Sequence, residues 1–126
     1  MLAVRFLNTK GSMNREIKFR GYSEDLKSFV YGFYQEVEVE GIGYSYIFWQ
    51  GNTTPIRADS VAQFTGMYDK NGKEIYEGDI LFHNLQGKRK VYYPFNENSA
   101  IYGMENIDNG MKSYLVNSHL YEVVLN

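Results

Sequence analysis

The sequence predicts a mainly β protein, built as a small antiparallel SH3-like or related twisted barrel with room for one short helix. Two observations favour this class: short runs that alternate apolar and polar side chains, and glycine and asparagine turns between them. Composition is the third, because the chain of 126 residues is 17% aromatic. Aromatic side chains favour pleated, half-buried surfaces, and this length suits one domain.

The N-terminal residues 1–12 are expected to be an extension ahead of a single β domain at 13–126. The junction at Ser12-Met13 is either a cloning seam or a natural extension before a second start. The run 1–7 is too short and too interrupted for the apolar region of a secretory signal. No run approaches the roughly 20 apolar residues of a membrane span. We therefore expect a protein of the bacterial cytoplasm with no membrane partner.

The first half of the domain alternates predicted strands with turns. The predicted strands cover residues 16–22, 28–34, 35–40 and 44–50. Val37 and Val39 alternate with glutamates, so we interpret that strand as a solvated edge that resists edge-to-edge pairing. The segment 51–55 is interpreted as a closing turn. Residues 56–62 stay open between a short helical turn and a loop.

The most aromatic run presents Tyr44, Tyr46 and Phe48 on one face of a strand and Ile47 and Trp49 on the other. A strand that is apolar on both faces is buried on both sides or lies in a subunit interface. We therefore predict that this run forms a subunit contact through its aromatic side chains, and that the protein is a homo-oligomer.

Two glycine-containing corners follow. Asp69, Asn71 and Gly72 predict a tight turn, because Asp bonds nearby amides while Asn and Gly tolerate positive φ. Apolar residues on both sides of this turn predict a β-hairpin. Gly78 and Asp79 predict a second corner, where a barrel strand bends. Further strands are predicted at 80–83, 88–93, 100–104, 113–116 and 121–125.

The corner region also carries a family resemblance. The run Gln-Phe-Thr-Gly at 63–66, followed by Asp-Lys-Asn-Gly-Lys-Glu-Ile-Tyr-Glu-Gly-Asp-Ile at 69–80, resembles the signature of the YopX family of phage and prophage proteins. Residues 14–20 are similar to that family's opening strand, although Gly21-Tyr22 stands where the family usually carries a small residue and Trp. The resemblance implies a mobile-element setting, self-association, and a host or phage macromolecule as partner.

Residues able to support catalysis or bind a metal are sparse. Cys is 0, which excludes disulfides, thiolate zinc sites and cysteine catalysis. His83 and His119 have no ligand spacing, so we predict no metal and no cofactor. Glu77 and Asp79 offer a carboxylate pair, but we favour an exposed Glu77 and a turn-bonding Asp79. No nucleophile or phosphate-cradle motif is present, so we predict a non-enzymatic protein with no catalytic residues.

Nucleic-acid binding is the alternative to a self-associating module. Lys88, Arg89 and Lys90 precede Tyr92 on a predicted strand, and cations with aromatic rings on a β surface bind single strands. Adjacent strand residues point to opposite faces, however, so the cations cannot all face one way. The net charge of −2 also favours a solvated hairpin over a nucleic-acid surface.

Overall fold

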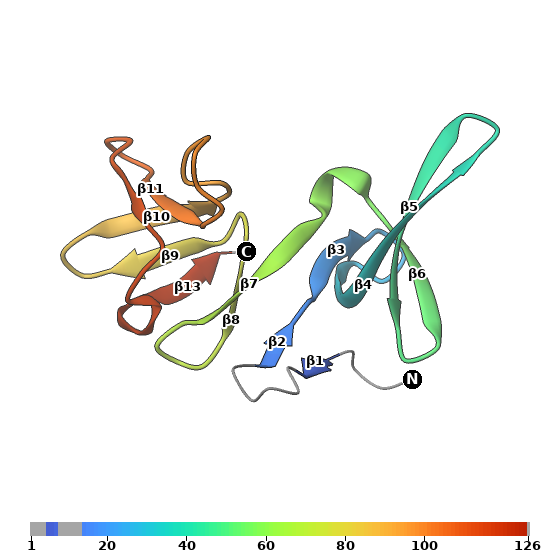
Figure 1. The fold of residues 1–126 in the computed structure, drawn as a ribbon, viewed down its shortest axis with the longest axis horizontal. Helices are drawn as coiled ribbons and strands as arrows, with labels where there is room; N and C mark the ends of the chain where they lie inside the picture. The colour runs from blue at the N-terminus through green and yellow to red at the C-terminus, as the bar shows by residue number, and fades with distance from the viewer. Residues whose placement is uncertain (1–4, 8–13, 126) are drawn as a thin grey trace. The chain divides into compact units, whose positions relative to one another are not determined.

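A computed structural model describes the backbone at residues 5–7 and 14–125 and the side chains at 16–125. These residues form antiparallel strands joined by turns, with short 3-10 helices at Ala58–Ser60 and Ser118–Leu120 (Figure 1). The predicted mainly β class is confirmed. No helix in this described part has the length and apolar character needed to cross a membrane. Most of the predicted N-terminal extension lies outside the described residues.

The chain divides into two compact units, residues 1–64 and 65–126. The single domain over 13–126 stays a prediction, and within it the contacts group into these two units. The division falls inside strand β7 (Ala62–Tyr68), whose first residues pair with strand β3 (Phe19–Ser23). No loop or change of composition marks the boundary, so the pattern of residues gives no sign of it.

The first unit is an antiparallel sheet with long neighbouring strands. Its strands before β7 are β1 (Arg5–Leu7), β2 (Asn14–Glu16), β3 (Phe19–Ser23), β4 (Ser28–Val39), β5 (Ile42–Trp49) and β6 (Asn52–Ile56). β1 pairs with β2, and the larger sheet has the order β6-β5-β4-β3-β7-β8, in which β8 (Glu74–Tyr76) belongs to the second unit. Glu40 and Gly41, with φ of 52° and 81°, form the two-residue turn between β4 and β5.

Two predictions for this unit are corrected. The predicted strands 28–34 and 35–40 are one strand, β4. The predicted closing turn at 51–55 is wrong, because the turn is only Gln50-Gly51 and the chain continues as β6. Pro55 misled the prediction, yet it fits here because β6 is an edge strand, where a missing N–H costs no ladder bond.

The sheet of the first unit curls without closing. The backbone N–H of Arg57 donates to the carbonyl of Tyr22 at 2.9 Å, so the end of β6 reaches β3. Ile56 packs over Gly21, where an added Cβ would lie 2.1 Å from the Ile56 Cδ1 atom. Among the described residues β6 and β3 share no strand ladder, so the predicted barrel is corrected to an open, curled sheet.

The second unit begins within β7 and continues with a hairpin and an antiparallel sheet. Its strands after β7 are β8 (Glu74–Tyr76), β9 (Ile80–His83), β10 (Gly87–Tyr92), β11 (Gly103–Asn106), β12 (Lys112–Tyr114) and β13 (Glu122–Leu125). β8 pairs beside β7, and the five-stranded sheet has the order β12-β11-β10-β9-β13. The strands predicted after residue 80 are present, with their ends displaced by a few residues.

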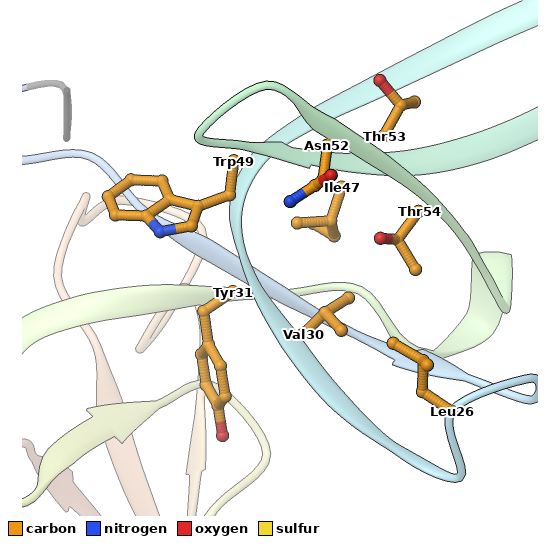
Figure 2. Close-up of a pocket in the computed structure, with 8 residues that line it drawn as sticks. All are labelled: Leu26, Val30, Tyr31, Ile47, Trp49, Asn52, Thr53 and Thr54. Carbon is orange, nitrogen blue, oxygen red and sulfur yellow. The ribbon is translucent and has the colours of Figure 1, made fainter. Parts of the chain in front are cut away.

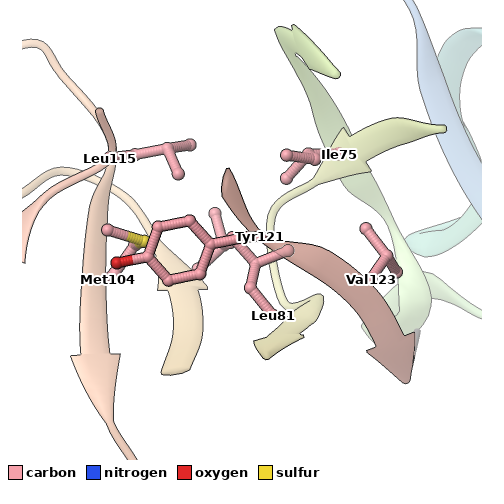
Figure 3. Close-up of a cluster of buried hydrophobic side chains, with 7 residues drawn as sticks. Ile75, Leu81, Met104, Leu115, Tyr121 and Val123 are labelled. Carbon is pink, nitrogen blue, oxygen red and sulfur yellow. The ribbon is translucent and has the colours of Figure 1, made fainter. Parts of the chain in front are cut away.

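The core of the second unit comes from side chains on one face of that sheet and from the segments that cover it (Figure 3). Its buried members are Ile75, Leu81, Val91, Met104, Leu115, Tyr121 and Val123. Fully burying a side chain such as Leu81 contributes about 1.5–3 kcal/mol. This core fixes the face of β10 that points inward, which decides where the predicted cations point.

Candidate functional site

The Asp69 turn connects two distant segments of the second unit. The Asp69 carboxylate is 5% exposed. Its Oδ1 accepts the backbone N–H groups of Asn71 and Lys73, both at 2.8 Å, and its Oδ2 accepts that of Val123 at 2.9 Å. Gly72 takes φ of 79° and its N–H donates to the Asp69 carbonyl. Asp69 therefore holds its own turn and also anchors β13.

The hydrogen bonds to Asp69 outweigh its burial. Burial raises the pKa of a carboxyl, but the N–H groups of Val123, Lys73 and Asn71 and the charge of Lys73 lower it, and the net pKa of Asp69 is lowered. The group is ionised at neutral pH and its oxygens already have backbone partners. This arrangement serves structure rather than acid–base chemistry.

The corner at Gly78 and Asp79 contains a second buried carboxylate, that of Asp79. Asp79 is 0% exposed, and its Oδ2 accepts the N–H of Tyr76 at 2.8 Å. Gly78 takes φ of 90° and its N–H donates to the carbonyl of Val91, which ties the corner to β10. Burial raises the pKa of Glu77. Asp79 thus bonds the turn backbone, while Glu77 is half-buried rather than exposed.

The β4–β5 hairpin extends beyond its neighbouring strands. β3 pairs with β4 only at residues 28–32, and β6 pairs with β5 only at 45–49. Among the described residues of the first unit, positions 35–44, which we call the ribbon, therefore have no neighbouring strand on either outer edge (Figure 1). An isolated two-stranded hairpin is marginally stable in water.

The ribbon has one apolar face. Val37 lies opposite Tyr44 and Val39 opposite Ile42, and opposed residues share a face. These four side chains, which we call the ribbon face, are between 36% and 58% exposed. The alternate residues Glu36 and Glu38 give the ribbon an acidic reverse face. The ribbon is therefore amphipathic, with its apolar side open.

The aromatic residues predicted as an interface lie on two sides of β5, as the alternation along the strand predicts. By strand alternation Tyr46 and Phe48, both half-buried, continue the side that carries Tyr44 and the rest of the ribbon face. Trp49 falls on the opposite side with the buried Ile47. The predicted contact therefore comprises two different surfaces.

Trp49 contributes to an open, mostly apolar groove in the first unit, with a volume of about 540 Å³ (Figure 2). The lining residues are Leu26, Val30, Tyr31, Ile47, Trp49, Asn52, Thr53 and Thr54. The groove could not be found from the sequence, because β6 was interpreted as a turn. Its walls carry no acidic or basic side chain.

The basic residues of β10 divide between two faces of the sheet. Lys88, Lys90 and Tyr92 lie on one face, and both lysines are exposed. Arg89 lies on the other face with the buried Val91. Lys112 from β12 joins the lysine face, with its Nζ 5.7 Å from the centre of the Tyr92 ring. Lys112 was missed because strand register is not readable from sequence.

The histidines lie in different elements, His83 in β9 and His119 in the second 3-10 helix. Within the described ranges no group of three or more His, Cys, Asp and Glu side chains is placed to hold a metal ion. The absence of a metal, of a cofactor and of catalytic residues stays a prediction.

Comparison with known protein families gives a match. The model of the YopX protein family matches residues 18–124, which span both units. No curated protein matches the chain. The match confirms the family resemblance drawn from residues 14–20 and 63–80.

Proposed function

Because the chain belongs to the YopX protein family, we propose that it is a non-enzymatic binding module that associates with a second copy of itself. The observation that carries the proposal is the exposed apolar face of the ribbon. The proposed setting is a phage or prophage protein acting in the cytoplasm of a bacterial host, where the module binds a host or phage macromolecule.

A second copy is the occupant that suits the ribbon face best. Two copies related by a two-fold axis present the same patch to each other, so apolar side chains meet apolar side chains. Val39 and Ile42 are each more than half exposed, and burying such side chains contributes about 25 cal/mol per Å² of apolar surface. A face-to-face contact would also stabilise the ribbon, because an isolated two-stranded hairpin is only marginally stable in water.

Edge-to-edge pairing is a weaker way to join two copies. The open edge of β4 carries Glu36 and Glu38, which would approach the same residues of the second copy. Like charges on neighbouring strands are destabilising, and such charges protect natural edges from pairing. Face-to-face packing leaves these glutamates on the reverse face, in water.

The experiment is light scattering on the wild type and on variants of the two ribbon faces. Ile42→Lys places a charge on the ribbon face and is expected to give a monomer, while Glu38→Gln on the reverse face retains self-association. Trp49→Ala tests the groove instead. A wild-type monomer refutes self-association, and dissociation by Trp49→Ala but not by Ile42→Lys assigns the contact to the groove.

A second candidate function is supported by the lysine face of β10. Lys88, Lys90 and Lys112 share the face of Tyr92, and Lys112 lies close to its ring, so cations could pair with phosphates while the ring stacks on a base. Glu105, which pairs with both Lys90 and Lys112, lies on this face too and reduces its positive charge. Fluorescence anisotropy with labelled single- and double-stranded DNA and RNA over a salt series tests it. Lys88→Gln is expected to reduce the salt slope, whereas no salt-dependent binding at low salt removes this function.

A further inference from the structure

Arg89 points into a pocket of the second unit, away from the lysine face. The pocket has a volume of about 280 Å³, close to the lower end of small-ligand sites. Its lining residues are His83, Gln86, Arg89, Met104, Ser113, Tyr114, Val116, Asn117, Leu120 and Tyr121. No aspartate or glutamate is among them, so no carboxylate of the lining balances the charge of the guanidinium.

The guanidinium of Arg89 is only partly paired. One of its terminal nitrogens, Nη1, donates to the Ser113 hydroxyl at 2.8 Å. Its Nε is buried and has no hydrogen-bond partner among the residues that the structure describes. A buried donor without a partner is costly, and a half-buried cation usually pairs with an acid. The pocket therefore carries the positive charge of Arg89, which no carboxylate of the lining neutralises.

Neighbouring polar groups in the pocket also offer donors. The Nδ1 of His83 accepts the N–H of Leu85 at 3.1 Å, so the neutral ring carries its proton on Nε2. The Tyr121 hydroxyl donates to the side-chain oxygen Oε1 of Gln86 at 2.5 Å, which leaves the side-chain NH₂ of Gln86 as a donor. Asn117 adds a second side-chain amide to the lining.

We infer that this pocket binds a small molecule that carries a carboxylate or phosphate group on an apolar body. The oxyanion pairs with the Arg89 guanidinium, whose planar fork matches the geometry of both groups. Met104, Val116 and Leu120 supply apolar wall for the rest of the ligand. The site is independent of the ribbon face and of the lysine face, and goes beyond the proposed self-association.

The experiment is an NMR titration of the full chain with two probes, sodium benzoate and inorganic phosphate, against sodium chloride at matched ionic strength. The Nε–H signal of Arg89 and the side-chain amides of Gln86 and Asn117 are expected to shift saturably with at least one probe. Benzoate alone identifies a carboxylate on an apolar ring, and phosphate alone identifies a phosphate group.

Two substitutions on one strand separate the site from general attraction of anions. Arg89→Gln keeps a donor toward Ser113 but removes the charge, and is expected to weaken binding at least about tenfold, the loss of one charge-assisted bond. Lys88→Gln removes the neighbouring charge on the opposite face and is expected to bind as the wild type.

The inference is overturned if the wild type shows no saturable shift with either probe, a result that does not depend on any variant folding. Equal affinity in the Arg89→Gln variant, or shifts confined to Lys88 and Lys90, also overturns it, because these are the signs of non-specific anion attraction. Loss of self-association leaves it untouched, since the ribbon face lies in the first unit.

Discussion

Replacing Asp69 by asparagine removes one charge while nearly preserving shape. The carboxylate accepts three backbone N–H groups, two within its own turn and that of Val123 in β13. Asparagine has one acceptor oxygen, so its NH₂ must face a backbone donor on one side. Hydrogen bonds to charged groups contribute about 1.5–3 kcal/mol each, so losing one and weakening the others is expected to lower the free energy of unfolding by about 3 kcal/mol.

The loss is expected to depend on pH in a defined direction. The folded-state pKa of Asp69 is lowered from its ordinary value of 3.8, which applies to the unfolded chain. Its stabilisation is therefore fully present above the unfolded pKa and disappears as the pH falls through the folded value. The difference between wild type and Asp69→Asn is expected to stay constant between about pH 5 and 7 and to shrink below about pH 4.

The measurement is urea unfolding followed by circular dichroism at several pH values, with hydrogen exchange of the Val123 amide as a local reading. Asp108→Asn is the matched control, because Asp108 is an exposed loop residue of the same unit. It is expected to change stability by less than about 0.5 kcal/mol. The reasoning fails if Asp69→Asn matches this control, or if its effect is the same at pH 3 and pH 7.

Other substitutions test the packing. Leu81→Ala empties a fully buried site and is expected to cost about 2–5 kcal/mol, measured by urea unfolding; a cost under about 1 kcal/mol would place Leu81 outside the core. Gly21→Ala forces Ile56 aside and is expected to cost about 1–3 kcal/mol, seen as earlier quenching of Trp49 fluorescence in urea; an unchanged midpoint would refute the close approach. Gly72→Ala strains a φ of 79° and is expected to cost about 1–2 kcal/mol, measured by thermal unfolding, whereas unaltered stability would contradict the left-handed turn.

Local features of the fold could be predicted from the sequence, since their causes lie within a few residues. The Asp69-to-Gly72 turn is specified by residues that favour it directly, and the alternation of apolar and polar residues located most strands. The second role of Asp69 could not be predicted, because its partner Val123 is 54 positions away. Proline gave a false turn signal at Pro55, since only the sheet order makes it an edge residue.

The candidate sites could not be predicted in full from the sequence, because their composition depends on the register between paired strands. Alternation showed that Lys88, Arg89 and Lys90 cannot share a face, but not which of them points inward. Pairing of β10 with β11 places Val91 opposite Met104 in the core. Arg89 lies two residues before Val91, so its side chain is on the same face of the sheet. Likewise, the sequence located the aromatic run at 44–50. It could not show that the ribbon face is exposed, because this depends on where the pairing of β3 and β6 with the hairpin ends.

Sedimentation equilibrium on the wild type and on Ile42→Lys tests most directly whether the ribbon face joins two copies. The chain has a mass of 14.7 kDa. The wild type is expected to sediment at twice that mass at micromolar concentration, and the variant at the single-chain mass. A wild type that stays at the single-chain mass into the high micromolar range, or a variant that remains dimeric, would contradict the proposed contact.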